Sequence, residues 1–215
     1  MSDEAELYYS AAMMASFWEY TMRAITMLSA LSTGFLLFQS LVHAQTDLDS
    51  PPVVECKPHL QQTFQQLHSD QIIDLCERAA GKALVVVNTA SFCGFTPQFK
   101  ALEALYEARK GEGLEIIGIP SDDFNQESAD QAETATICFK NYGVSFMMTE
   151  PAHVTGPKAN PLHRWLIETT GEAPRWNFHK YVIARDGRVV ATFPSKTSPD
   201  AASFTSAVDQ ALSDL

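Results

Sequence analysis

Residues 83–121, ALVVVNTASFCGFTPQFKALEALYEARKGEGLEIIGIPS, decide the fold. The apolar runs at 83–91 and 114–121 are rich in β-branched residues and are typical of strands buried inside a parallel sheet. Residues 96–113 between them have the apolar spacing of a helix that packs one face on such a sheet. This strand–helix–strand order predicts a right-handed parallel crossover.

The predicted helix has recognisable start and stop signals. Thr96 can cap it, Pro97 suits its first turn, and Gly111 or Gly113 can end it. We expect its apolar face to pack on the sheet, and this face consists of Phe99, Leu102, Leu105 and Tyr106.

Three further elements follow the crossover. Residues 130–143 are typical of a second helix, and residues 181–194 are two apolar runs around Asp186-Gly187, a strong hairpin signal. Residues 198–215 predict a closing helix whose first residue, a serine, is the cap. Parallel strands followed by an antiparallel hairpin predict an α/β protein with a mixed central sheet flanked by helices. A thioredoxin-like fold is the natural candidate.

Composition limits the classes of function. The chain has 215 residues, enough for one full-sized domain plus a tail, and a net charge of −11. We expect no nucleic-acid partner, because no basic patch or stripe is visible. The four cysteines lack C-x-x-C and zinc-finger spacing and the six histidines are dispersed, so we expect no metal site and no cofactor.

Residues 1–44 have the composition of a targeting segment rather than of a domain. The apolar stretch 24–38 follows Arg23, and small residues precede a cut after Ala44, as in a secretory signal peptide. The acidic residues upstream of Met22 do not suit the basic start of a signal, so we expect translation to begin at Met22. The mature protein is then expected to be periplasmic or secreted.

Other interpretations of this segment stay open. Residues 24–43 approach the length of a membrane-spanning helix, and would anchor the protein, although several polar residues make them a poor span. A buried helix in a soluble protein is a weaker option. Under each of these, residues 45–66 are an N-terminal segment and residues 67–215 are the folded domain.

Export bears on two of the four cysteines. Cys56 and Cys76 lie ahead of the first strand, and oxidising export compartments favour disulfides. We therefore expect a structural disulfide that fastens the N-terminal segment. Two free thiols are the alternative.

Cys93 is the candidate reactive residue. It follows a predicted parallel strand and directly precedes a helix, and ligand sites in open α/β sheets lie outside the carboxyl ends of the strands. The unpaired N–H groups of a helix start favour thiolate over thiol. Thr96 stands where a C-x-x-C enzyme needs its second cysteine. A lone thiolate suits attack on peroxide, which gives a sulfenic acid; a buried, inert cysteine is the alternative.

Three segments resemble the signatures of the glutathione peroxidase family, in order and with family-like spacing. They are VVVNTASFCGFTPQF (85–99), with cysteine where some members carry selenocysteine, GIPSDDFNQES (118–128) and PRWNFHKYVIARDG (174–187). The resemblance covers roughly Leu67 to the C-terminus. It implies a thioredoxin-like fold and peroxidase activity.

The resemblance implies a catalytic tetrad of Cys93, Gln126, Trp176 and Asn177. Amide and indole N–H groups are neutral donors that can stabilise a thiolate and orient a peroxide. The family pattern has one more residue before its Gln-Glu pair, so Asn125 is an alternative to Gln126. From residue type alone, Trp176 would be a core anchor and Asn177 a turn residue.

The resemblance also implies a resolving cysteine, because thiol-dependent members of the family carry one on the second predicted helix. Cys138 would attack sulfenylated Cys93 and form a disulfide that a redox protein reduces. The helix must loosen for this, since a disulfide needs Cα atoms within about 7 Å. A buried, inert Cys138 is the alternative.

The sequence thus favours an enzyme of oxidative-stress response that reduces hydrogen peroxide or organic and lipid hydroperoxides. The segment between residues 166 and 174 is short where tetrameric family members carry a long insertion, which implies a monomer. No cluster of basic residues for glutathione is visible, so we expect a thioredoxin-like reductant, with glutathione as the alternative. A thiol–disulfide oxidoreductase or peroxide sensor on the same fold, and a non-catalytic binding domain, are the competing hypotheses.

Overall fold

The computed structural model describes residues 56–213. The predicted signal peptide, the alternative anchor at 24–43 and the start at Met22 therefore lie outside the described residues. Within the described part of the chain, no helix combines the length and the apolar character needed to cross a membrane.

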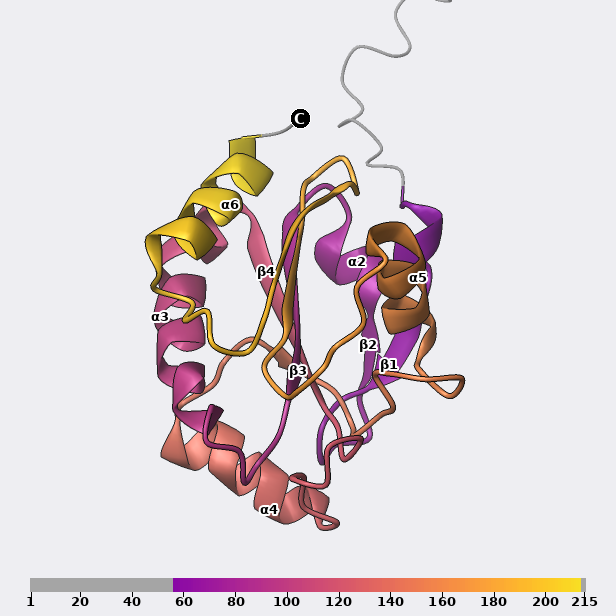
Figure 1. Ribbon diagram of the computed structural model, residues 1–215, viewed down its shortest axis with the longest axis vertical. Coiled ribbons are helices and arrows are strands. Elements are labelled where there is room, and N and C mark those ends of the chain that lie inside the picture. Colours follow the sequence, from indigo (N-terminus) through magenta and orange to yellow (C-terminus); the bar gives the residue numbers. More distant parts are fainter. Residues whose placement is uncertain (1–55, 214–215) are drawn as a thin grey trace, which may run out of the picture. The chain divides into compact units, whose positions relative to one another are not determined.

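A five-stranded mixed sheet forms the centre of the fold (Figure 1). Its strand order is β5-β4-β3-β6-β7. The central strands β3 (Ala83–Thr89) and β4 (Leu114–Pro120) are parallel, and β5 (Met147–Met148) continues the parallel half. The strands β6 (Lys180–Ile183) and β7 (Val189–Phe193) form the antiparallel half. All residues of β3 and β4 are buried, as expected of strands covered on both faces. The predicted mixed sheet is confirmed.

Helices cover both faces of this sheet (Figure 1). The long helices α3 (Phe99–Arg109) and α6 (Ala202–Ser213) lie on one face, and α2 (Leu75–Ala79) and α5 (Pro161–Thr170) lie on the other. The buried apolar side chains accordingly form two clusters, one against α3 and α6 and one against α2 and α5. Cys93 belongs to the first cluster.

The start of the α3 region differs in detail from the prediction. A 3₁₀ turn, η2 (Thr96–Gln98), comes first, and the Thr96 side chain does not cap it. The hydroxyl of Thr96 instead accepts from the backbone N–H of Cys93 over 3.1 Å. At the other end, η3 (Lys110–Glu112) extends the helix to Gly113, whose φ of 91° is readily adopted only by glycine. Gly113, rather than Gly111, ends this helical region.

The second predicted helix is present but irregular. Its first part, α4 (Gln131–Ala135), is an α-helix capped by the side chain of Asp130. The chain then widens into a π-helical turn, η4 (Thr136–Asn141), that carries Cys138. π-Helical turns are rare and often occur at functional sites.

The predicted cap of the last helix was wrong. Ser198 does not begin α6, because its carbonyl accepts from the N–H of Ala201 over 3.0 Å and closes a separate turn. Pro199 suits the second position of such a turn. The helix begins after this turn, at Ala202.

The N-terminal part of the described chain contains elements that the sequence did not suggest. A short turn, η1 (Pro58–Leu60), precedes an antiparallel hairpin of β1 (Thr63–Gln65) and β2 (Ile72–Asp74). The hairpin spans the predicted boundary between residues 66 and 67. A disulfide joins Cys56 to Cys76 on α2. Cys56 packs against the cluster of α2 and α5, on the opposite face of the sheet from Cys93.

Candidate active site

Cys93 lies in the loop that leaves the carboxyl end of β3 and enters η2. Its side chain is 7% exposed, and its Sγ accepts a hydrogen bond from the backbone N–H of Phe95 over 3.4 Å. The Thr96 hydroxyl closes the loop by donating to the carbonyl of Ala90 over 2.9 Å. Thr96 thus has a structural role at the position where a C-x-x-C enzyme has its second thiol. The sulfur is held where a backbone donor can stabilise negative charge on it.

Gln126 and Asn177 meet beside this loop, although they are 51 residues apart in the chain. The Asn177 side-chain N–H donates to Oε1 of Gln126 over 3.0 Å. The backbone carbonyl of Gln126 accepts from the N–H of Phe92, the neighbour of Cys93, over 2.9 Å. The structure therefore brings Gln126 and Asn177 together next to the segment that carries Cys93.

The loop before Gln126 is one residue shorter than the family pattern, so the sequence left both Asn125 and Gln126 as candidates for the amide at the site. Asn125 is exposed and has a positive φ of 56°, and its backbone N–H donates to the carbonyl of Asp122. This conformation places Asn125 in the turn. Of the two amides, Gln126 is the one that bonds to Asn177.

Trp176 stands at the surface beside the site. Its side chain is 42% exposed, and its ring lies 5.5 Å from that of Phe124, centroid to centroid. Within the described residues, its indole N–H has no hydrogen-bond acceptor. Trp176 is thus not the buried core anchor that residue type alone would suggest, and its donor is available to a ligand.

Asn88 positions the segment that carries Trp176 and Asn177, and the sequence analysis missed it. Its side-chain N–H donates to the carbonyl of Trp176 over 3.2 Å, and its Oδ1 accepts from the N–H of His179 over 3.0 Å. Phe178, between these contacts, is held at a φ of 63°, which is unusual for a bulky residue. The available signal was a lone amide, fully buried, near the end of an apolar strand.

Glu127 connects the site to the helix that carries Cys138, and it too was missed. One carboxylate oxygen, Oε1, accepts from the hydroxyl of Ser91, from the hydroxyl of Thr134 over 2.8 Å and from the N–H of Ser128 over 2.7 Å. The other, Oε2, is buried without a hydrogen-bond partner. Ser91 lies two residues before Cys93, so this network ties the Cys93 loop to α4.

Cys138 is a buried free thiol, 2% exposed, in the same apolar cluster as Cys93. Burial, and to a lesser extent the negative charge of Glu127, raise the pKa of the Cys138 thiol to about 12. In this closed arrangement Cys138 is a poor nucleophile.

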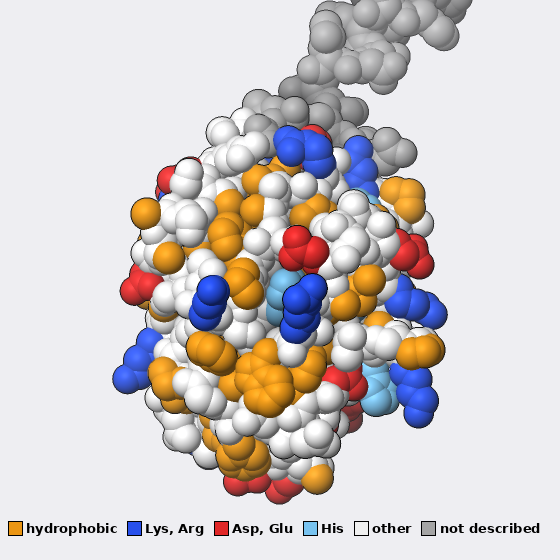
Figure 2. All heavy atoms as spheres, viewed as in Figure 1, with side chains coloured by type: hydrophobic (Ala, Val, Ile, Leu, Met, Phe, Trp, Pro, Cys, Tyr) orange, Lys and Arg blue, Asp and Glu red, His pale blue; other side chains and the backbone are white. Residues whose placement is uncertain are grey.

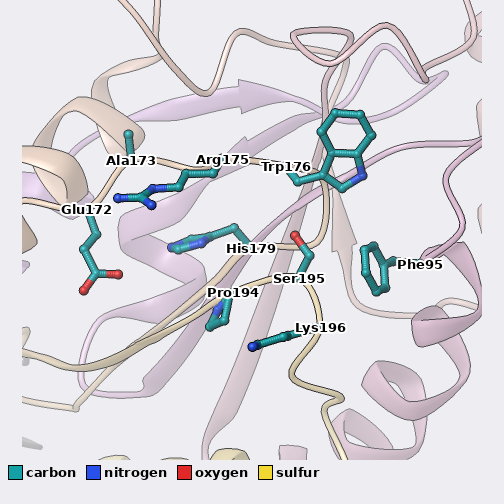
Figure 3. Close-up of a pocket in the computed structure, with 9 residues that line it drawn as sticks. All are labelled: Phe95, Glu172, Ala173, Arg175, Trp176, His179, Pro194, Ser195 and Lys196. Carbon is teal, nitrogen blue, oxygen red and sulfur yellow. The ribbon is translucent and has the colours of Figure 1, made fainter.

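A cavity of about 590 Å³ opens beside Phe95, two residues after Cys93. Its lining comes from the loop after Cys93, from residues 172–179 and from the segment after β7, and comprises Phe95, Glu172, Ala173, Arg175, Trp176, His179, Pro194, Ser195 and Lys196 (Figure 3). Basic, acidic and histidine side chains gather above a hydrophobic patch on the face shown in Figure 2. Arg175 and Lys196 are distant in sequence but line one cavity, which the sequence alone did not indicate.

Metal ligands do not gather in the described part of the chain: it contains no group of three or more His, Cys, Asp and Glu side chains that could hold an ion. Within the described residues, the donor bonded to the Cys93 sulfur is the neutral backbone N–H of Phe95, and the neutral amides of Gln126 and Asn177 lie beside the Cys93 loop.

Known proteins resemble this chain in sequence. The family model for glutathione peroxidase matches residues 62–167, which include Cys93, Gln126 and Cys138. The glutathione peroxidase of Lactococcus lactis subsp. cremoris is 46% identical over 125 residues, 56% of this chain and 80% of that protein. The hydroperoxy fatty acid reductase Gpx2 of Synechocystis sp. is 41% identical over 137 residues, 63% of this chain and 88% of that protein.

Solved structures share the fold. The crystal structure of apo Trgpx, 30% identical, superposes with a TM-score of 0.58 over 74% of this chain and 98% of that one. A thioredoxin family protein from Chlorobium tepidum, 16% identical, superposes with a TM-score of 0.55 over 74% and 97% of the two chains. The predicted thioredoxin-like fold is confirmed.

Proposed function

Because this chain belongs to the glutathione peroxidase family, we propose that it is a thiol peroxidase that reduces hydroperoxides through Cys93. The observation that carries the proposal is the hydrogen-bonded pair of Gln126 and Asn177 beside the Cys93 loop. Neutral amide donors next to a thiol suit the stabilisation of a thiolate and the orientation of a peroxide.

The first step oxidises Cys93. The thiolate attacks the distal oxygen of ROOH, an S–O bond forms, the O–O bond breaks, and RO⁻ takes up a proton and leaves as ROH. The side-chain N–H groups of Gln126 are the ones that can donate to the peroxide, because its Oε1 already accepts a hydrogen bond from Asn177. With the indole N–H of Trp176, these donors stabilise the leaving oxygen as its negative charge develops.

Cys138 then resets Cys93. Its sulfur attacks the sulfenic acid, the S–S bond forms and water leaves. The buried position of Cys138 and the raised pKa of its thiol require the π-helical turn to open first, which exposes the sulfur to water and lowers its pKa. An external dithiol reduces the disulfide by exchange and is itself oxidised.

A thioredoxin-like protein is the proposed reductant, and the protein is proposed to act as a monomer. An internal Cys93–Cys138 disulfide is a substrate for a dithiol donor, whereas a monothiol such as glutathione would need two molecules. A thiol–disulfide oxidoreductase function on the same fold is less well supported, because Thr96 occupies the place of a second thiol and is bonded within the loop.

Export to the periplasm or beyond the cell is part of the proposal. The Cys56–Cys76 disulfide supports it, since structural disulfides persist mainly in oxidising compartments. N-terminal sequencing of the exported protein tests the cleavage, with Gln45 as the expected first residue and an intact Met1 as the contrary result.

Peptide mapping by mass spectrometry after one equivalent of peroxide tests the catalytic cycle. We expect a new Cys93–Cys138 disulfide, with the Cys56–Cys76 disulfide unchanged. A Cys93 sulfenic acid that persists beside a free Cys138 thiol would contradict the resolving role while leaving the peroxidase step intact.

A further inference from the structure

Glu127 has one carboxylate oxygen that is fully bonded and one that is buried and free. Oε1 accepts hydrogen bonds from the hydroxyls of Ser91 and Thr134 and from the backbone N–H of Ser128. Oε2 is buried, and no group in the described part of the chain bonds to it. A buried polar atom without a partner is rare in proteins and calls for an explanation. The catalytic cycle proposed above leaves this acceptor unused.

Glu127 lies between the two segments whose cysteines must meet in that cycle. Its partner Ser91 lies two residues before Cys93, and its partner Thr134 lies on α4, four residues before Cys138. Four residues are about one helical turn, so Thr134 and Cys138 share a face of this helix. Both side chains are buried, with exposures of 1% and 2%. The hydrogen bond to Thr134 therefore holds the carboxylate about one helical turn from the Cys138 thiol.

The negative charge of Glu127 acts on the Cys138 thiol. Burial, and after it this charge, raise the pKa of Cys138. The charge opposes a second negative charge on the sulfur, but the same carboxylate is a base that can take the thiol proton. The other charged residues of this segment are exposed, namely Asp130, Glu133 and Lys140. Among the charged residues between 127 and 141, Glu127 is the one with a buried, unpartnered oxygen.

Formation of the internal disulfide needs an acceptor for one proton. A free cysteine has a pKa of about 8.5, so Cys138 is still mostly thiol near neutral pH after the turn around it opens. The thiolate is the nucleophile. We propose that Glu127 is the proton acceptor for Cys138 in the step that forms the Cys93–Cys138 disulfide. This inference rests on the proposed peroxidase function and adds a residue to its second step.

One proton passes through Glu127 in this step. It moves from Sγ of Cys138 to Oε2 of Glu127 while the Cys138 sulfur attacks the sulfur of the Cys93 sulfenic acid. The S–S bond forms, the S–O bond breaks, and the leaving hydroxide takes the proton from Glu127 and departs as water. The carboxylate is regenerated, and the step needs no further oxidant or reductant.

Glu127→Gln tests this role, because glutamine keeps the shape and an oxygen for the three donors but is not a base. After one equivalent of hydrogen peroxide, rapid-quench alkylation and mass spectrometry would follow the oxidation of Cys93 and the loss of the free Cys138 thiol separately. Cys93 oxidation should change little, and disulfide formation should slow by about 10²-fold, as expected for the loss of a general base. Glu133→Gln is the matched control, because it removes an exposed carboxylate from the same helix, and it should react like wild type.

Two other roles of Glu127 give different results. If it acts only through its charge, Glu127→Gln would lower the pKa of Cys138 and make disulfide formation faster. If it only ties the Cys93 loop to α4, Thr134→Val would slow this step as much as Glu127→Gln. Either result would overturn the inference. Raising the pH from about 7 to about 9 should restore most of the rate in Glu127→Gln, because the opened Cys138 then ionises in water. A structural defect would not be corrected in this way.

A mixed disulfide between Cys93 and thionitrobenzoate separates this inference from the peroxidase function. Attack of Cys138 on it forms the same internal disulfide and releases coloured thionitrobenzoate, with no peroxide present. Release should be about 10²-fold slower in Glu127→Gln than in wild type. Equal rates, or no release in wild type, would overturn the inference. If peroxide fails to oxidise Cys93 while Glu127→Gln slows this release, the peroxidase function is wrong and the role of Glu127 stands.

Discussion

The side-chain N–H of Asn177 donates to Oε1 of Gln126 over 3.0 Å and thereby fixes which end of the Gln126 amide is free. The Gln126 oxygen is occupied, so its nitrogen is the group that can serve the reaction. Oδ1 of Asn177 is buried without a hydrogen-bond partner in the described part of the chain. The next two predictions follow from this pair.

Gln126→Ala should slow the oxidation of Cys93 by hydrogen peroxide by about 10²-fold, the usual effect of removing one donor to a developing oxyanion. Stopped-flow measurement of the first turnover reports this rate. Asn125→Gly is the matched control, because Asn125 is exposed, has a positive φ that glycine tolerates, and should react like wild type. A normal rate for Gln126→Ala would reject Gln126 as a catalytic donor.

Asn177→Asp should reverse the orientation of the Gln126 amide. A carboxylate only accepts, so the Gln126 nitrogen would turn to Asp at position 177 and leave the reaction without a donor. We expect a loss of rate similar to that of Gln126→Ala, measured in the same way. The double variant should then be little slower than either single variant, whereas multiplied losses would show that the two residues act independently.

Cys138→Ser should leave the first oxidation of Cys93 unchanged and abolish turnover with a thioredoxin system. The reason is that Cys138 enters only at the second step, where the disulfide forms. Mass spectrometry should find a sulfenic acid on Cys93, or its over-oxidised products, in place of the internal disulfide. Full turnover with a thioredoxin system would contradict the resolving role.

Replacing Cys56 and Cys76 together by serine should lower the free energy of unfolding by about 3 kcal/mol. The disulfide closes a loop with a sequence separation of 20, and its main effect is to restrict the unfolded chain. Denaturant unfolding measures the loss. Cys93 oxidation should proceed at the wild-type rate, because the disulfide packs on the other face of the sheet.

Lys180 should make stability depend on pH in the alkaline range. Burial lowers its pKa in the folded protein from 10.5 to about 7, so between these values the unfolded chain binds more protons than the folded protein. Stability therefore falls as pH decreases from about 10 to 7 and levels off below 7. The slope from this group is at most about 1.4 kcal/mol per pH unit.

Lys180→Met removes this titration. The stability of the variant relative to wild type should rise as pH falls from about 10 to 7, as measured by urea unfolding at several pH values. A constant difference over this range would show that Lys180 stays charged in the folded protein. The variant also loses the bonds to Gln98 and Thr197, which lowers its stability by an amount that does not depend on pH.

Local patterns in the sequence predicted most of the sheet and the position of Cys93. Apolar runs of about seven residues form buried central strands in a small α/β protein, and the bounds of β3 and β4 agree closely with the predicted runs. The hairpin β1–β2 could not be predicted, because its strands are only three residues long and their stability comes from tertiary contacts. The π-helical turn at Cys138 also lacks a local signal.

The segments that carry the candidate site residues could be recognised in the sequence, but the hydrogen bonds between those segments could not. Cys93, Gln126, Trp176 and Asn177 stand in recognisable segments. The contacts of Asn88 and Glu127 reach across the chain, and nothing in the residues around them indicates those partners. Arg175 precedes β6 and Lys196 follows β7, and the two residues line the same cavity because the β6–β7 hairpin reverses the direction of the chain.

Steady-state reduction of hydrogen peroxide by wild type and Cys93→Ser tests the central claim most directly, with a thioredoxin system and glutathione supplied in turn. Wild type should reduce peroxide with at least one of these donors, faster with the thioredoxin system, and Cys93→Ser should be inactive with both. Absence of wild-type activity with every donor, or undiminished activity of Cys93→Ser, would contradict the assignment of this protein as a Cys93 peroxidase.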